Sequence, residues 1–344
     1  MKYNKKLEDA LVLKMGGTVR GASEEALIFS RGKVSDIVRD ALNLITFNPD
    51  AISERAMKTA DFPELLLGAG RRIMEQEFEA TAITYAGFVT EVDVNDFREN
   101  IDITRGSGGR LDKYHETGEL KEKHLGESAE KWYLESYGNK FVLTRKMIIN
   151  DDLGAFSDMA RELGQMAALT ANGIVFDMLT AKGDYASYKM SDGKAIFDPS
   201  HDNATSKPLD STSLALARSA MRMHKGIDGK TLLNITPSFL IVGPDLEQTA
   251  YELIHSSAKV EDNKSSGVAN YHEGSLKIIV DAEIIGDSWY LSANRKGIKV
   301  GYLAGTHRKP VIGVNISTQT KTEFEGIFDF GIVCQNYKGL FKGK

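Results

Sequence analysis

The chain has 344 residues, of which 42% are hydrophobic and 26% are charged. This balance is typical of a soluble globular protein with one large or two medium domains. No apolar run reaches about 18 residues, and residues 1–13 lack the basic-then-apolar order of a secretory signal. A formal net charge of −5 argues against binding that depends on neutralising nucleic-acid phosphates. We therefore expect a protein that stays in the cytoplasm of its producing cell, with no membrane contact and only non-specific contact with DNA.

Residues 1–60 mix polar and apolar side chains without a pattern long enough for an independent core. Short amphipathic stretches such as residues 34–42 occur within them. We interpret this region as an arm that needs a partner surface.

Two segments with alternating hydrophobicity follow, and both predict long strands. In the first, residues 88–94, one side carries Phe88, Val92 and Val94. The second covers residues 137–149, with Phe141, Leu143, Met147 and Ile149 on one side.

Residues 98–136, between the two strands, hold nine acidic and seven basic side chains and several glycines. Such a stretch buries too little apolar surface to order itself, so in a monomer we expect a solvated excursion. A loop of this length inside a compact domain usually has a function. The alternative, a surface hairpin without a binding role, stays open.

A long helix is predicted next. Asn150, Asp151 and Asp152 offer capping oxygens and negative charge where the helix would begin. Apolar residues, with one threonine among them, then recur at spacings of three and four, at Phe156, Met159, Leu163, Met166, Thr170 and Ile174. We expect this face to be buried and the helix to end near residues 182–183, before a Gly- and Asp-rich connection at 191–203.

The remainder mixes helices and strands. Helices are predicted near residues 211–224 and 245–257, the second opened by a capping-box-like pair, Asp245 and Gln248. Strands are predicted at residues 240–242, 276–280 and 288–291. The segment 322–334 alternates, with Phe324, Phe328, Phe330, Ile332 and Cys334 on one face. No internal repeat is present, so solenoids and propellers are excluded.

Catalytic and metal-binding signatures are not found. The seven histidines are dispersed without a metal-ligand spacing, at His115, His124, His201, His224, His255, His272 and His307. We interpret the loop His201-Asp202-Asn203 as a hydrogen-bonded turn and the lone Cys334 as a buried apolar residue. Gly68-Ala69-Gly70 lacks the third glycine of a dinucleotide fingerprint. The sequence therefore predicts no enzyme, no cofactor and no metal.

A string of motifs in order is similar to one known family. The matching stretches are Arg55-Ala56-Met57, Asp61-Phe62-Pro63, Asp96-Phe97-Arg98, Glu116-x-Gly118-Glu119, Leu125-Gly126-Glu127, Tyr137-Gly138-x-x-Phe141, Asn150-Asp151-Asp152-Leu153-Gly154, Asp192-Gly193, His201-x-Asn203, Ala217-Arg218 and Trp289-Tyr290-Leu291. From about residue 30 to the last residue, the chain resembles the Mu-like major head subunit family of phage capsid proteins. This resemblance implies the α+β Hong Kong 97 capsid fold and the function of a major capsid protein.

The resemblance also assigns a part to each segment. It implies an N-terminal arm and linker-like region at residues 1–84. The peripheral P-domain would follow, with strands at 85–149 that include an E-loop at about 98–136, and with a spine helix and connection at 150–210. The axial A-domain would cover 211–320, and a last P-domain strand would cover 321–344. Residues 1–60 resemble the linker that follows a fused protease in this family.

The predicted E-loop resembles the loop that, in this capsid fold, lies over a neighbouring subunit. The residues expected to make intersubunit contacts there are Arg105, Arg110, Lys113, Glu116, Glu119, Lys121 and Lys123. The implied partners are further copies in pentamers and hexamers, a scaffold and prohead protease, a portal, decoration proteins and the packaged DNA, and the implied location is the virion capsid.

Other functions stay open. An encapsulin-type compartment shell shares the implied fold, and genomic neighbours would distinguish it from a phage capsid. A hydrolase using His201, Asp202 and Glu116 lacks a supporting triad. Some proteins of this fold crosslink their chains by joining an E-loop lysine to an asparagine of a neighbouring chain. Here the candidate lysines are Lys113, Lys121 and Lys123, the candidate asparagine is Asn336, and the acid would be Glu323 or Glu325.

Overall fold

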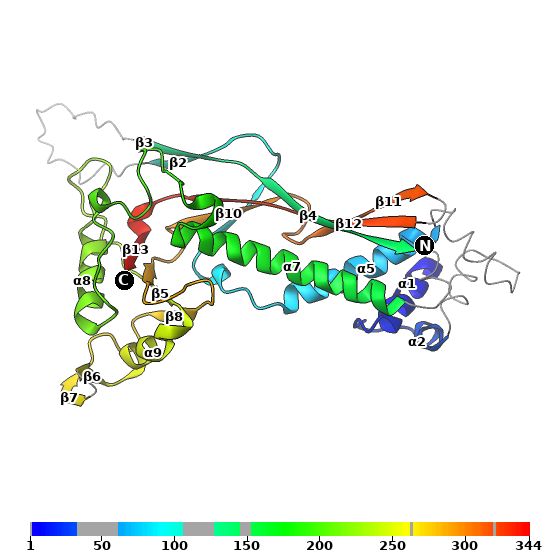
Figure 1. The fold of residues 1–344 in the computed structure, drawn as a ribbon, viewed down its shortest axis with the longest axis horizontal. Coiled ribbons are helices and arrows are strands. Elements are labelled where there is room, and N and C mark those ends of the chain that lie inside the picture. Colours follow the sequence, from blue (N-terminus) through cyan, green and yellow to red (C-terminus); the bar gives the residue numbers. More distant parts are fainter. Residues whose placement is uncertain (1, 33–60, 106–126, 145–152, 262–263, 319–320) are drawn as a thin grey trace, which may run out of the picture. The chain divides into compact units, whose positions relative to one another are not determined.

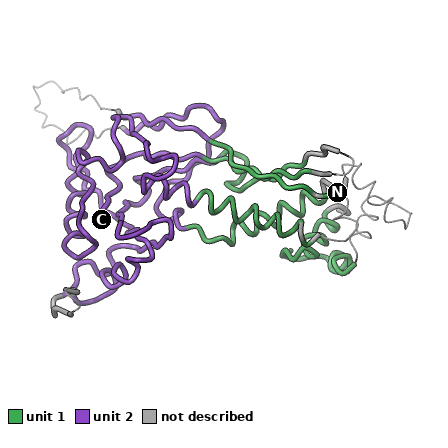
Figure 2. The backbone as a smooth tube through the Cα atoms, in the orientation of Figure 1, with its two compact units in different colours: residues 1–83, 135–171, 303–330 green, residues 84–134, 172–302, 331–344 purple. Residues whose placement is uncertain are grey.

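The computed structural model describes residues 2–32, 61–105, 127–144, 153–261, 264–318 and 321–344. Helices and strands are mixed along the chain (Figure 1), which confirms the predicted α+β class. The chain forms two compact units (Figure 2). Unit 1 comprises residues 1–83, 135–171 and 303–330, and unit 2 comprises residues 84–134, 172–302 and 331–344. The segment boundaries implied by the family resemblance stay a prediction.

Unit 1 begins with the helices α1 (Lys2–Lys14), α2 (Glu24–Arg31) and α5 (Asp61–Ala80). Helix α2 begins at Ser23, whose hydroxyl accepts a hydrogen bond from the Ala26 amide. α1 packs against both α2 and α5, and its buried side chains Leu7, Leu11 and Val12 lie in the unit 1 core. The N-terminal helix α1 therefore shares a core that α5 and later segments supply, in agreement with the expected lack of an independent core in residues 1–60.

Helix α7 (Leu153–Thr180) confirms the predicted long helix, with residues 153–171 in unit 1 and 172–180 in unit 2. Its buried face includes Phe156 and Leu163, as expected, but continues through alanines such as Ala160 and Ala168. Met166 is 39% exposed, so its predicted burial is wrong; Thr170 and Ile174 are half-buried. Small alanines let the helix approach its neighbours closely and place Met166 at the edge of that face. The predicted cap at residues 150–152 lies outside the described residues.

The unit 1 sheet is centred on β12 (Lys321–Cys334), which pairs antiparallel with β4 (Glu135–Thr144) and β11 (Val311–Thr318). The strands β4 and β12 were both predicted from the sequence, although β4 is described only to Thr144. Phe324 is opposite Phe141 in the β12–β4 register, and their rings stack with centroids 5.4 Å apart. All five residues expected on one face of β12 are buried.

Unit 2 contains a four-stranded sheet in the order β13–β9–β5–β8. These strands are β5 (Phe239–Val242), β8 (Lys277–Val280), β9 (Trp289–Ser292) and β13 (Leu340–Gly343). Helices α8 (Ser211–Met223) and α9 (Glu247–His255) contribute to the same core. The remaining strands of this unit are β1 (Thr90–Val94), β2 (Asn100–Arg105), β3 (Glu127–Trp132), β6 (Ala258–Glu261), β7 (Lys264–Ala269) and, apart from its last residue, β10 (Ile298–Leu303).

Two local expectations need correction. The strand predicted from residue 88 begins at Thr90, and Phe88 follows the short 3₁₀ turn Tyr85–Gly87 as a buried residue. Asp245 does not cap α9, because it lies inside the 3₁₀ turn Pro244–Leu246 that precedes the helix. Proline at the first position of this turn favours the tighter start.

Candidate functional site

The candidate site is the β2–β3 hairpin of unit 2, which forms both ends of the predicted excursion. The strands pair antiparallel from Asn100 opposite Trp132 to Arg105 opposite Glu127. The base of the excursion is thus a regular ladder, which corrects the expectation of a stretch without order. Of the seven expected contact residues, only Arg105 lies in a described strand, and the others, Arg110, Lys113, Glu116, Glu119, Lys121 and Lys123, lie outside the described residues.

Each face of the hairpin mixes polar and apolar side chains, because the buried Trp132 lies on the inward face and the exposed Lys131 lies opposite Ile101 on the outward face. On the outward face, Ile101 is 54% exposed and Ile103 is 49% exposed. The inward face instead carries Asp102 and Glu130, which are opposite each other in the register. A sheet with one solvated face normally turns its polar side chains to water and its apolar side chains to the core. The outward isoleucines therefore form an apolar surface that this unit leaves uncovered.

The inward carboxylates hold the hairpin to the rest of unit 2. The carboxylate of buried Glu130 accepts hydrogen bonds from Ser191, at 2.5 Å from its hydroxyl and 2.9 Å from its amide. Lys299 lies 2.5 Å from the Asp102 carboxylate, with both side chains only 13% exposed. Burial raises the pKa of Glu130, the Ser191 hydrogen bonds oppose this, and the charges of Asp192 and Asp102 raise the pKa further; the net shift is upward.

An aromatic contact fixes the base of the hairpin. Trp132 is buried, and a Cβ atom at Gly301 of β10 would lie 2.2 Å from its ring. Glycine is therefore needed for the indole to approach this strand so closely. At the exposed edge, Glu99 accepts hydrogen bonds from Lys131 at 2.9 Å and from the Tyr133 hydroxyl at 2.8 Å. The hairpin base is consequently anchored by both packing and polar contacts.

A cavity of about 430 Å³ lies beside the inward face. Its lining includes Thr104, Glu130, Asp192, Ile227, Asn336 and Lys338. Burial alone would raise the pKa of Asp192, but hydrogen bonds from His201 and the Lys194 amide lower it. Burial lowers the pKa of Lys338. The lining thus combines acidic, basic and apolar groups.

The predicted His201-Asp202-Asn203 turn lies next to this cavity. The His201 ring nitrogens lie 3.1 Å from the Ile196 carbonyl oxygen and 2.7 Å from the Asp192 carboxylate. The ring also stacks on Tyr337 with centroids 3.8 Å apart. Asp202 takes a left-handed conformation with φ of 53°. Since both nitrogens of His201 are engaged, the interpretation as a hydrogen-bonded turn is confirmed.

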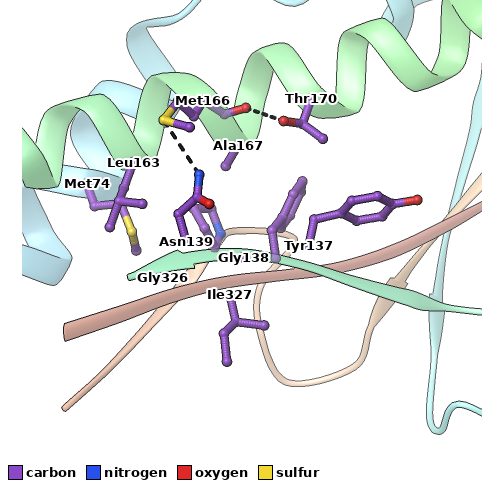
Figure 3. Close-up of a pocket in the computed structure, with 12 residues that line it drawn as sticks. Met74, Tyr137, Gly138, Asn139, Leu163, Met166, Ala167, Thr170, Gly326 and Ile327 are labelled. Carbon is purple, nitrogen blue, oxygen red and sulfur yellow. Dashed lines mark hydrogen bonds between the residues drawn. The ribbon is translucent and has the colours of Figure 1, made fainter. Parts of the chain in front are cut away.

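A second hollow lies in unit 1, between α7 and the strands β4 and β12 (Figure 3). Its volume is about 50 Å³, and Met166 and Ile327 contribute to its lining. The Asn139 amide nitrogen lies 3.9 Å from the Met166 sulfur. A space of this size is large enough for ordered water.

The described part of the chain offers neither a metal-binding cluster nor a membrane-spanning helix. No group of three or more His, Cys, Asp or Glu residues there could hold a metal ion. Among the helices of the same residues, none has the length and apolar character needed to cross a membrane.

Comparison with known proteins identifies the family. A family model described as "Phage capsid protein" matches residues 128–343, which includes most of unit 2 and residues 135–171 and 303–330 of unit 1. The chain belongs to the phage capsid protein family. This confirms the capsid function and the virion capsid location expected from the sequence, while the Mu-like branch stays a prediction. A search of curated proteins finds no match to this capsid protein.

Solved structures similar to this capsid protein have low sequence identity. One from Gordonia phage Cozz is 11% identical with a TM-score of 0.49, covering 77% of this chain and 87% of that one. The capsid of bacteriophage JBD30, decorated with minor capsid protein trimers, is 16% identical with a TM-score of 0.46, at 60% and 92% coverage. A virus-like particle from Pyrococcus furiosus is 10% identical with a TM-score of 0.44, at 80% and 98% coverage.

Neither the exposed isoleucines of the hairpin nor the residues that anchor it were predicted from the sequence. Ile101 and Ile103 alternate with polar residues, which is a strand signal, but their exposure reverses the usual rule. Glu130, Ser191 and Lys299 are distant from their partners in sequence and belong to no motif. Only the fold brings them together.

Proposed function

We propose that this capsid protein is the major head subunit, which assembles into pentamers and hexamers of an icosahedral shell around the DNA genome. In this proposal the β2–β3 hairpin is an E-loop, and its outward isoleucines lie on a neighbouring copy. The observation that carries the proposal is the exposure of Ile101 and Ile103 on the face opposite the carboxylates that anchor the hairpin in its own unit.

The energetics suit reversible assembly. Fully burying an exposed isoleucine contributes about 1.5–3 kcal/mol, and Ile101 and Ile103 are each about half exposed. Each hairpin would therefore contribute about 1.5–3 kcal/mol to a contact that a shell repeats many times. Contacts this weak dissociate readily when misplaced and become strong only through repetition.

The charged residues expected at the loop, from Arg105 to Lys123, would orient this contact through exposed ion pairs, each contributing about 0–1 kcal/mol. A scaffold, a prohead protease, a portal and decoration proteins are further proposed partners, which the family resemblance supports. Contact with the packaged DNA would be non-specific, consistent with the net charge of −5.

We further propose a structural rather than catalytic role. The hydrolase alternative needs a free nitrogen on His201, but both nitrogens face acceptors within unit 2. The encapsulin alternative is disfavoured by the match to the phage capsid family over residues 128–343. The crosslinking lysines lie outside the described residues, so that chemistry stays a prediction.

The test replaces both outward isoleucines with serine, as Ile101→Ser together with Ile103→Ser. The side chains contribute little to the subunit core, so the melting temperature should stay within a few degrees of wild type. Particle yield in negative-stain electron microscopy, after expression with scaffold and protease, should fall at least tenfold. Ile285→Ser is the matched control, because Ile285 is 76% exposed but lies outside the hairpin. Normal particle yield from the double variant would contradict the proposal.

A further inference from the structure

The outward face of α8 carries no charge. Thr212, Leu216, Ser219 and Met223 follow at spacings of four, three and four and are all exposed, so they share one side of the helix. Leu216 is 50% exposed and Met223 is 61% exposed. A helix that borders water normally places charged residues on this side. The α8 outward face is therefore uncharged, with two apolar and two hydroxyl side chains, where a solvated helix would carry charges.

Basic residues flank this face. Arg222 is exposed beside Met223. Arg218, one turn earlier, donates hydrogen bonds to the Ser275 hydroxyl at 2.9 Å and to His272 Nδ1 at 3.1 Å. Its guanidinium also lies 5.1 Å from the centroid of the Tyr271 ring. A partner for the α8 outward face should accordingly combine an apolar or aromatic centre with negative charge.

The outward face of α9 has these properties. Glu247, Gln248, Tyr251 and His255 are exposed there, while Ala250, Leu253 and Ile254 are buried on the opposite side. Tyr251 is 61% exposed, and its ring packs on His255 with centroids 4.4 Å apart. The acidic Glu247 lies one turn before this aromatic pair.

We infer that the α8 outward face of one copy packs on the α9 outward face of the next copy. Leu216 and Met223 would cover the Tyr251 ring, a favourable contact for a methionine sulfur, and Arg222 would pair with Glu247. Pairing α8 with α8 would instead leave Arg222 without an acidic partner, because no acidic residue lies within α8. The inference rests on the proposed function, because it assumes that copies of this chain assemble.

This pairing has a consequence for symmetry. Two different surfaces of the same unit meet, so the contact is heterologous, and repeated heterologous contacts close into rings when the rotation allows. A ring is the arrangement that pentamers and hexamers require. A self-complementary contact would stop at a dimer.

The test introduces one cysteine on each helix, as Leu216→Cys together with Tyr251→Cys. The native Cys334 is fully buried, so it should not compete. After mild oxidation of assembled material, a non-reducing gel should show a ladder extending beyond the dimer. Leu216→Cys alone should give no crosslink, and Leu216→Cys with Ile285→Cys is the matched control, expected to give none.

Particles that form normally but show no ladder in the double variant would overturn the inference and leave the proposed function standing. A covalent dimer from Leu216→Cys alone would also overturn it, because α8 would then face α8. If the wild-type chain forms neither rings nor particles with scaffold and protease, both the proposed function and the inference fail.

An independent charge exchange completes the test. Arg222→Glu and Glu247→Arg should each lower the capsomer yield on size exclusion at least threefold, and the double exchange should restore most of it. Equal yields from the single and double variants would overturn the proposed pairing of Arg222 with Glu247.

Discussion

Replacing Phe324 should destabilise unit 1 more than changing almost any other single residue there. The side chain is fully buried, stacks on Phe141 at 5.4 Å and meets Phe156 edge-on at 4.9 Å between ring centroids. Phe324→Ala would remove both ring contacts and leave a cavity in the core that α1 and α5 also line. Substitutions of this kind cost about 3–5 kcal/mol. For a unit of about 150 residues this corresponds to a fall in melting temperature of roughly 6–20 °C.

The assay is thermal unfolding of the isolated subunit followed by circular dichroism, with Met166→Ala as the control. Met166 is 39% exposed and lies at the edge of the buried face of α7, so its truncation should cost about 1 kcal/mol or less. If Phe324→Ala melts within two degrees of wild type, or no lower than Met166→Ala, the reasoning about this core is wrong.

Two further predictions concern unit 2. The folded-state pKa of Glu130 lies above its ordinary value of 4.5. Protonation of this carboxyl therefore adds to the free energy of unfolding below pH 4.5, and the contribution is lost as the pH rises through the folded-state pKa. Glu130→Gln should therefore flatten the fall in urea midpoint as the pH rises above 4.5, and an unchanged pH profile would contradict the raised pKa of this buried carboxyl. Burial, followed by the nearby Glu130 charge, raises the pKa of the Cys334 thiol, so a thiol reagent such as DTNB should label no cysteine in the native subunit and one in denaturant. Rapid labelling of native protein would show that Cys334 is accessible.

Elements with a strong repeating pattern could be predicted from the sequence. The alternation from Phe324 to Cys334 gave the face of β12 correctly, because one side of that strand is apolar throughout. The extent of α7 also followed from its periodicity. The error at Met166 arose because the prediction counted large apolar residues and overlooked the buried alanines Ala160 and Ala168, which set how closely the helix packs.

The candidate site was harder to predict, because its geometry depends on contacts between distant segments. Glu130 is held by Ser191, and Asp102 by Lys299, and neither pair leaves a local signal. The sequence of the hairpin alternates, but the burial rule assigns the wrong face to the core. The exposed isoleucines become interpretable only with the chain's membership of a shell-forming family, in which a second copy can cover them.

The interleaving of the two units has a consequence for how the protein folds during synthesis. Leu7, Leu66 and Phe324 share one core, although the ribosome makes the first of them long before the last. The first two would remain exposed until β12 emerges, and closing contacts over such sequence distances is intrinsically slow. Newly made chains should therefore spend time with α1 and α5 uncovered, when exposed apolar surface favours aggregation. A cell that makes many copies at once would need chaperones or an early-binding partner. These would keep the exposed helices of one chain from associating with those of another until β12 is added.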